Sequence, residues 1–226
     1  MASWMVHLRV ADKLLDRIEG ITETEFIVGN IAPDSGVPNE DWTAYTPCTE
    51  VSHFKTYLKD GAVKIDVERY LKQYFTAEQQ NGYSREQYSF FLGYLTHLLT
   101  DLEWIARIYN PSVAKYPEAH AEDSHKLLWT LKKDWYDLDF LYLKKHPDFR
   151  AFRIYENAVG FVNRYMDIFA QDAFDNRREY ITGFYRGGRE DIEREYTYLT
   201  EAQAQQFVED CVEAVLEKLE GICTVS

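Results

Sequence analysis

Apolar residues recur at helical spacing along most of this chain. Over residues 4–18 an apolar side chain falls on one stripe every three or four positions, which predicts an amphipathic helix that ends at Gly20. The same pattern predicts further helices at residues 66–75, 84–110, 120–144, 148–170, 172–185 and 200–219. No alternating run is long enough to predict a strand. The pattern therefore predicts an all-α protein, a multi-helix bundle.

Capping residues mark several of the predicted helix ends. Ser84 and Gln87 form a capping box at the start of the helix over 84–110, and Thr200 and Gln203 form another before the last helix. The dipeptide Asn110–Pro111 is expected to end the long helix, because proline disfavours helical backbone in the residue before it.

Residues 21–65 lack the helical pattern. Glycine, proline and small polar residues are frequent there, so we expect a long loop with one short helix near residues 26–29. A loop of that length in a compact domain is usually either functional or disordered. Its aromatic residues favour the ordered, functional case.

Length and charge narrow the class of protein. A chain of 226 residues with 46% hydrophobic residues suits one domain, which we assign to residues 1–226 with a helical C-terminal part from about residue 147. There are 25 basic and 38 acidic residues, for a net charge of -13. This charge disfavours binding to nucleic acids and electrostatic docking on membranes. The arginines within 176–179 and 186–189 supply local positive charge that could receive an anion, but surface ion pairing is the preferred interpretation.

Cysteine usage and hydropathy indicate the compartment. The three cysteines, Cys48, Cys211 and Cys223, are widely spaced and form no CxxC pair, which fits a reducing environment. No apolar run reaches the roughly 18 residues of a membrane span, and charges interrupt the apolar stretch at the N-terminus. We therefore expect a cytoplasmic protein without stable membrane association. The pattern gives no indication of the oligomeric state.

The predicted helix over 84–110 carries two polar side chains in an apolar setting. His97 and Asp101 are four residues apart, so they lie on one helix face, about 6 Å apart along the axis. Burying both without a partner or an ion would cost several kcal/mol, and the two groups suit a divalent cation. A histidine and an aspartate at this spacing can also simply pair as ions. The pair alone leaves both interpretations open.

Three further residues offer metal-ligand chemistry, each with an ordinary alternative. His7 lies between apolar positions of the first predicted helix, where a hydrogen-bonded core histidine is the commoner interpretation. Asp34 lies in a Pro-Asp-Ser-Gly sequence that also forms an ordinary turn, although such a turn would present its carboxylate rigidly to a metal. His53 follows the irregular segment and is either a ligand or a turn residue.

Taken in order, these residues resemble a known family. The elements are His7-Leu8 in the first helix, an aspartate in a glycine-rich turn, Ser52-His53-Phe54, and Gly93-Tyr94-Leu95-Thr96-His97-Leu98-Leu99-Thr100-Asp101. Over roughly residues 4–105 their order and spacing resemble the zinc-dependent phospholipase C family, most closely its short bacterial branch of phospholipase C-like hydrolases. The resemblance implies an all-α fold of the phospholipase C and single-strand nuclease type, with a metal cluster at the base of a cleft.

The resemblance also implies roles for individual residues. His53, His97 and Asp101 would bind one metal, with Asp34 beside it as a ligand or general base. Asp101 would bridge to a second metal, which His7 would also bind. Zinc is the implied cofactor, with one to three ions, and another divalent metal is an alternative.

The second half of the family's ligand set departs from its pattern here. A ligand histidine follows the His-x-x-x-Asp helix in the phospholipases, but no histidine occurs between Asp101 and His120, and His125 has no carboxylate four residues later. Asp134 falls where the short bacterial branch places a carboxylate, so we name it as a ligand of the second metal. His120 and His125 are candidates of second rank, the ordinary alternative being solvent-exposed histidines at a helix start.

The implied function is a metal-dependent phosphoester hydrolase. Water activated by the metal would attack phosphorus, and Asp34 would orient or deprotonate that water. Thr96 or Thr100 would orient the ligands. The expected partner is a small-molecule phosphoester, and a soluble phosphodiester or phosphomonoester fits as well as phospholipid. The alternatives are a non-catalytic metal-binding domain with a regulatory or structural role, and a helical scaffold without metal.

Overall fold

The computed structural model describes residues 2–41, 43–57 and 63–223, and over this part of the chain the predicted all-α class is confirmed as a mostly helical fold. The longer helices are α1 (Trp4–Leu15), α2 (Glu23–Ile31), α4 (Val67–Tyr74), α6 (Arg85–Trp104), α9 (Ser124–Lys145), α10 (Arg150–Asn157), α11 (Ala173–Arg186) and α12 (Glu201–Glu220). The shorter helical segments are η1 (Ala32–Asp34), α3 (Thr49–Ser52), α5 (Ala77–Gly82), η2 (Ile105–Tyr109), α7 (Asn110–Lys115) and α8 (Pro117–Glu122). Two small antiparallel hairpins pair β1 (Val37–Pro38) with β2 (Tyr45–Thr46) and β3 (Lys55–Tyr57) with β4 (Val63–Ile65).

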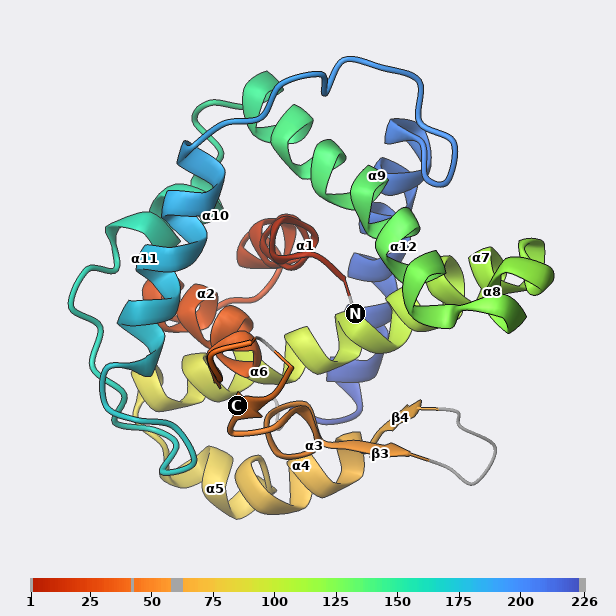
Figure 1. The fold of residues 1–226 in the computed structure, drawn as a ribbon. Coiled ribbons are helices and arrows are strands. Elements are labelled where there is room, and N and C mark those ends of the chain that lie inside the picture. The colour runs from red at the N-terminus through yellow and green to blue at the C-terminus, as the bar shows by residue number, and fades with distance from the viewer. Residues whose placement is uncertain (1, 42, 58–62, 224–226) are drawn as a thin grey trace.

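Helix α1 lies at the centre of the molecule. Seen nearly end-on in Figure 1, it is surrounded by other helices, and α2, α6, α10 and α12 contact it. Its buried residues run without a break from Met5 to Ala11, as expected for a helix covered on several sides. Ser3 caps the helix by accepting a hydrogen bond from the Val6 amide. The central position buries His7 completely.

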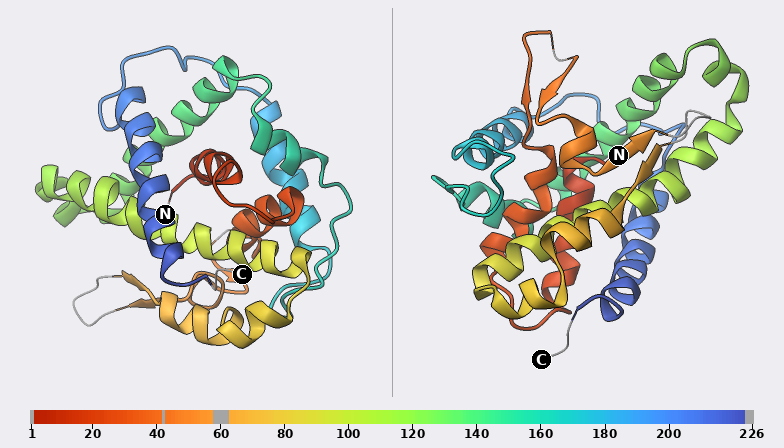
Figure 2. Two further views of the ribbon diagram at one scale, coloured as in Figure 1. Left: turned by 180° about the vertical axis from the view of Figure 1, so that it is seen from behind. Right: turned by 90° about the horizontal axis from the view of Figure 1, so that it is seen from below.

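Helices α2 and α6 touch backbone to backbone. A Cβ atom added to Gly93 would lie 2.1 Å from the carbonyl oxygen of Phe26, and one added to Gly29 would lie 2.1 Å from the carbonyl oxygen of Phe90. Only glycine at both positions permits this approach. Figure 2 shows α6 from behind and below, running across the molecule beside α2. The contact brings the C-terminal end of α2 next to the face of α6 that carries His97.

The segment predicted as a long loop, residues 21–65, contains more regular structure than expected. The helix expected near residues 26–29 is α2, which is longer and buries every residue from Phe26 to Ile31. Burial on all sides removes the polar stripe by which a helix is recognised in a sequence. The prediction of no strands was wrong, because strands of two or three residues are too short to produce an alternating pattern.

Several predicted helix ends are confirmed, and others move. Both capping boxes are present, at Ser84 and at Thr200. Pro111 does not end the long helix: α6 continues through the π-helical turn η2 into α7, where Pro111 lies in the first turn and its missing N–H group is not needed. The first helix ends at Leu15 rather than 18. The predicted helix over 148–170 ends at Asn157.

Cys48, Cys211 and Cys223 are free thiols. Within the described ranges, no helix combines the length and the apolar character needed to cross a bilayer.

Candidate metal centre

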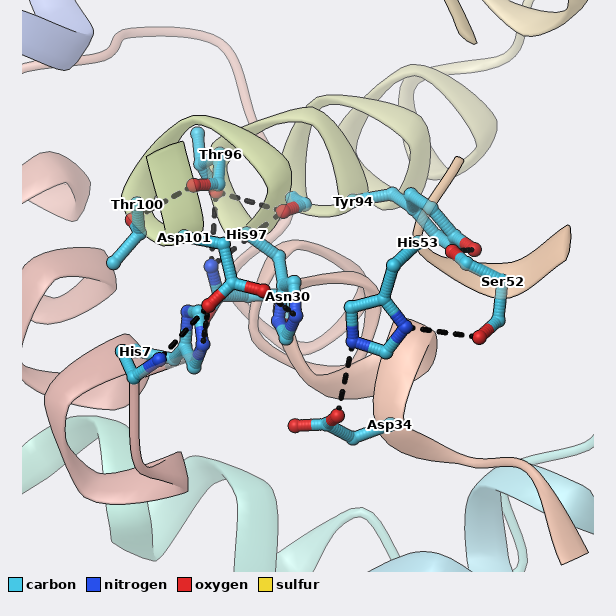
Figure 3. Close-up of polar contacts among 12 residues, drawn as sticks. His7, Asn30, Asp34, Ser52, His53, Tyr94, Thr96, His97, Thr100 and Asp101 are labelled. Atoms are coloured by element: carbon cyan, nitrogen blue, oxygen red, sulfur yellow. Dashed lines mark hydrogen bonds and ion pairs between the residues drawn. The ribbon is translucent and has the colours of Figure 1, made fainter. Parts of the chain in front are cut away.

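Helix α6 supplies the first two side chains of the site. His97 and Asp101 are fully buried on one face of the helix, and His97 Nε2 lies 3.7 Å from Asp101 Oδ2. The apolar residues around them fix the helix in the core, so the two polar groups cannot turn toward solvent. Figure 3 shows both side chains pointing into the same space between α6, α1 and the segment after α2.

Helix α1 supplies His7 to the same space. The His7 and His97 rings stack with centroids 3.7 Å apart and planes 5° from parallel, and His7 Nε2 lies 3.4 Å from Asp101 Oδ1. The backbone N–H of Ala2 donates to Asp101 Oδ1 at 2.9 Å. Asp101 therefore faces both imidazoles, one through each carboxylate oxygen.

Asp34 and His53 complete the cluster from the segment predicted as a loop. Asp34 ends η1 and His53 follows α3, and His53 Nε2 lies 3.1 Å from Asp34 Oδ1. The His53 ring centroid lies 5.1 Å from that of His97. Four separate segments, α1, η1, α3 and α6, thus bring five metal-ligand side chains together (Figure 3).

Neighbouring groups fix the orientation of each imidazole. His97 Nδ1 lies 2.7 Å from the backbone oxygen of Asn30, so Nδ1 carries the proton and Nε2 keeps its lone pair. The Asn30 side chain donates in turn to Thr96 Oγ1 at 2.9 Å. The Thr96 hydroxyl therefore holds Asn30, whose carbonyl in turn orients His97. The Thr100 hydroxyl instead donates to the Thr96 carbonyl within α6.

His53 is held from its other side by Ser52. The Ser52 hydroxyl lies 2.9 Å from His53 Nδ1, and the Ser52 carbonyl accepts a hydrogen bond from the Tyr94 hydroxyl. A hydroxyl both donates and accepts, so Ser52 fits either tautomer of His53. The next residue, Phe54, has φ of 54°, in the left-handed region that a bulky side chain seldom adopts. Its ring packs edge-on against Tyr70 at 5.3 Å, which holds this turn and the direction of His53.

The cluster leaves several buried polar atoms without a hydrogen bond. Among the described residues, His7 Nε2, His7 Nδ1, His97 Nε2 and Asp101 Oδ2 have no such partner. Unsatisfied polar atoms are uncommon in a core because each costs about 1–3 kcal/mol. Two groups of ligand atoms, His7–His97–Asp101 and Asp34–His53–His97, each lie within 4.8 Å of one another. Imidazole and carboxylate donors at this spacing fit a zinc ion.

The electrostatic state of the cluster also suits a cation. Burial, aided by the neighbouring His7, lowers the pKa of His97 to about 3. Burial alone would raise the pKa of Asp101, but the close contact with His7 and the other imidazole holds it well below its usual range. The pKa of Asp34 is lowered in the same way, against the effect of burial, by its hydrogen bond with His53 and by the imidazoles nearby. His97 is therefore neutral and both carboxylates are ionised near neutral pH, which are the metal-binding forms.

His97 belongs to both ligand groups but offers one nitrogen. Its Nδ1 is engaged with Asn30, so only Nε2 can bind an ion, and one nitrogen binds one ion. Two ions at this site would therefore share a carboxylate rather than His97. Asp101 has one oxygen toward His7 and the other toward His97.

The structure places the remaining candidates elsewhere. Asp134 is buried on α9, but Arg194 donates to its Oδ1 and the Tyr198 amide donates to its Oδ2, each at 2.7 Å. Both oxygens are thus engaged in holding the segment before α12, and Asp134 does not join the cluster. His120 on α8 is half-buried and His125 on α9 is exposed, and neither joins the cluster. His125 accepts a hydrogen bond from the Trp129 indole at 3.0 Å.

A cavity of about 240 Å³ lies beside the cluster. Asp34 and His53 line it, while His97, Asp101 and His7 lie behind them and are fully buried. Aromatic side chains of Trp4, Trp135 and Tyr136 form part of the wall. The lining also includes basic side chains from α9 and α11. Asp34, whose side chain is 17% exposed, is the carboxylate through which the cluster meets solvent.

Asn30 and Ser52, which orient two of the histidines, have no recognisable signal in the sequence. Asn30 acts through its backbone oxygen, which every residue possesses, and Ser52 is one of many serines in a polar segment. Gly93 lies inside the apolar run of the predicted helix over 84–110, a position that often marks close backbone approach, whereas its partner Gly29 lies in the segment without a helical pattern.

Comparison with known proteins agrees with the geometry. Residues 6–104 match the family model described as zinc dependent phospholipase C, which confirms the resemblance seen in the sequence. The matched range contains all five clustered residues and ends with the last residue of α6. No curated protein and no solved structure matches the chain.

Proposed function

Because residues 6–104 match the zinc dependent phospholipase C family model, we propose that this protein is a metal-dependent phosphoester hydrolase. One observation carries the proposal: unsatisfied buried imidazole and carboxylate atoms from separate segments converge beside a cavity into which Asp34 opens. A scaffold without metal would leave these atoms uncompensated in the core.

The ligand assignment is the one that the family resemblance implies. His97 Nε2 and one oxygen of Asp101 would hold one zinc ion together with His53 Nε2, whose present contact with Asp34 Oδ1 the ion would replace. His7 Nε2 and the other Asp101 oxygen would contribute to a second. When bound, zinc supplies Lewis acidity, which lowers the pKa of water toward neutrality and polarises a phosphoryl group.

Asp34 has the role closest to the reaction. Its carboxylate lines the cavity, stays ionised at neutral pH, and lies beside the ligand histidine His53. In this position it would accept a hydrogen bond from the attacking water and direct the water's lone pair toward phosphorus. Ser52 and Asn30 position the two histidines, and the fully buried cluster behind them excludes bulk solvent.

The size of the cavity limits the substrate. Sites that enclose a drug-sized ligand are typically 300–1,000 Å³, and the cavity here is about 240 Å³. It would accept a phosphoryl group with a small substituent, whereas long acyl chains would have to remain outside.

Zinc content and turnover test the proposal together. Purified protein would be stripped with chelator, reloaded with zinc, and assayed with bis(p-nitrophenyl) phosphate. We expect at least one tightly bound zinc ion, loss of turnover on stripping, and its recovery on reloading. His97→Ala should abolish both zinc binding and turnover.

His125→Ala is the matched control, because it removes an exposed histidine outside the cluster and should leave both properties unchanged. Zinc-loaded wild-type protein that shows no turnover on a panel of phosphomonoesters and phosphodiesters would refute the hydrolase proposal. It would favour a non-catalytic zinc-binding domain. This test needs no variant, so it does not depend on whether His97→Ala folds.

A further inference from the structure

Two basic side chains from the later part of the chain line the cavity beside the histidine cluster. Lys132 projects from α9 and Arg177 from α11, and both reach the same cavity as Asp34. Neither is fully exposed: Arg177 is buried and Lys132 is half-buried. The chain carries a net charge of -13, so a pair of cations in this cavity is opposite in sign to the overall charge.

Neither cation has a carboxylate partner within the described residues. The Arg177 guanidinium donates to the Gly36 carbonyl and lies over the Tyr180 ring at 5.4 Å. Lys132 Nζ lies 4.9 Å from the Trp129 ring centroid. Other arginines of α11 and the following turn are ion-paired, namely Arg178 with Asp175, Arg186 with Glu156 and Arg189 with Asp137. The expectation of surface ion pairs thus fits these arginines and fails for Arg177.

Arg177 also ties this wall to the site. Gly36, whose carbonyl accepts its hydrogen bond, lies two residues after Asp34. The guanidinium therefore steadies the turn that presents Asp34 while keeping its charge at the cavity.

Lys132 lies within electrostatic range of the ligand carboxylates. Burial lowers the pKa of Lys132, whereas the negative charges of Asp34 and Asp101 raise it. Lys55, which follows His53 by two residues, faces the same two carboxylates and the same lysine. Once a divalent cation neutralises the carboxylates, the positive charge of Lys132 needs a counter-charge from a ligand.

We propose that Lys132, supported by Arg177, binds an anionic group of the substrate and makes the protein selective for dianionic phosphoesters over esters that carry a quaternary ammonium. This inference rests on the proposed function for the reaction itself. Among the described residues that line the cavity, Asp34 is the one carboxylate, and it belongs to the metal cluster. A quaternary ammonium would therefore meet two unpaired cations and no free carboxylate, leaving only aromatic faces such as Trp135 and Tyr136 to attract it.

Ligand binding tests the inference independently of turnover. Zinc-loaded protein would be titrated calorimetrically with phenylphosphonate, a dianion that is not hydrolysed. Lys132→Gln should weaken binding roughly 10- to 100-fold, as expected for loss of a charge-assisted hydrogen bond. Lys132→Arg should restore most of the affinity. Lys133→Gln is the matched control, because it makes the same charge change on the exposed neighbouring position, outside the cavity lining.

Turnover of three chromogenic esters with one leaving group tests the selectivity. We expect kcat/KM to be highest for p-nitrophenyl phosphate, lower for bis(p-nitrophenyl) phosphate and lowest for p-nitrophenyl phosphorylcholine. In Lys132→Gln the preference for the first over the last should fall about 10-fold or more, mainly through KM. Zinc content and melting temperature, measured on every variant, identify any that fail to fold.

The outcomes separate the two proposals. Equal phenylphosphonate affinity in wild type and Lys132→Gln would overturn the anion site, as would a wild-type preference for the phosphorylcholine ester. Binding that depends on Lys132 without turnover of any ester would refute the hydrolase and leave the anion site standing.

Discussion

Gly93→Ala is the sharpest test of how the fold builds the site. The new Cβ would lie 2.1 Å from the Phe26 carbonyl oxygen, and real Cβ atoms are essentially never found closer than 3.0 Å to such a group, so the backbones must separate by about 0.9 Å. Both clashing groups belong to buried helices, so neither can rotate away as a side chain would. The substitution therefore moves α2 relative to α6.

The structure sets the size of the effect. Overpacking costs about 1–3 kcal/mol, and the better helix propensity of alanine returns up to about 1 kcal/mol. We expect a net loss near 2 kcal/mol in the free energy of unfolding, since a backbone-to-backbone clash belongs at the upper end. The same displacement would stretch the 2.7 Å contact between Asn30 O and His97 Nδ1 beyond hydrogen-bond length. Loss of such an orienting bond typically costs 10- to 100-fold in metal affinity.

Urea unfolding of the metal-free protein and zinc competition with a chromogenic chelator measure the two effects. Gly183→Ala is the matched control: this helical glycine of α11 has nothing within 4 Å of its added Cβ. It should gain up to about 1 kcal/mol and keep its zinc affinity. If Gly93→Ala behaved like Gly183→Ala in both measurements, the argument that the glycine contact positions His97 would be wrong.

Three further predictions concern metal and pH. Zinc at about 100 times its Kd should raise the free energy of unfolding by about 2.7 kcal/mol, seen as a higher Tm that chelator reverses, and an unchanged Tm would count against a metal site. Ser52→Ala should weaken zinc binding by about 10-fold in the chelator competition, because His53 loses its orienting hydroxyl, while an unaltered affinity would remove Ser52 from the site. Burial raises the pKa of Asp139 from 3.8 to about 7 in the folded state, despite hydrogen bonds from Ser3 and Tyr185. The folded state therefore holds this proton more tightly, so stability should fall as pH rises from about 4 to about 7. Asp139→Asn should flatten that slope in urea unfolding, and a slope equal to that of wild type would contradict the assignment.

The helix that carries His97 and Asp101 was predictable because its signals are local. The Ser84 capping box, the apolar run and the spacing of the two polar residues all lie within one element. The order of His7, Asp34 and His53 before it added the resemblance that places them in one site. Where those side chains meet, however, depends on the contact between α2 and α6, which is tertiary.

Other features had no local signal. Asp134 has the chemistry of a ligand, but Arg194, sixty residues later in the chain, engages it in the fold. Lys132 and Lys133 look alike in a polar run, and only the packing of α9 decides that one lines the cavity and the other faces solvent. A proline usually marks the end of a helix, but Pro111 lies within a continuous helical stretch. The π-helical turn η2 before it lets the new helix α7 begin there.

Two stretches of the chain form the cavity, and each contributes a different kind of side chain. Every clustered metal-ligand residue lies between His7 and Asp101, whereas Lys132, Trp135, Tyr136 and Arg177 contribute much of the facing wall. On the proposed function, substitutions in this facing wall would change which ester enters without replacing any metal-ligand residue. The specificity of the protein could then be redesigned on α9 and α11 separately from its metal chemistry.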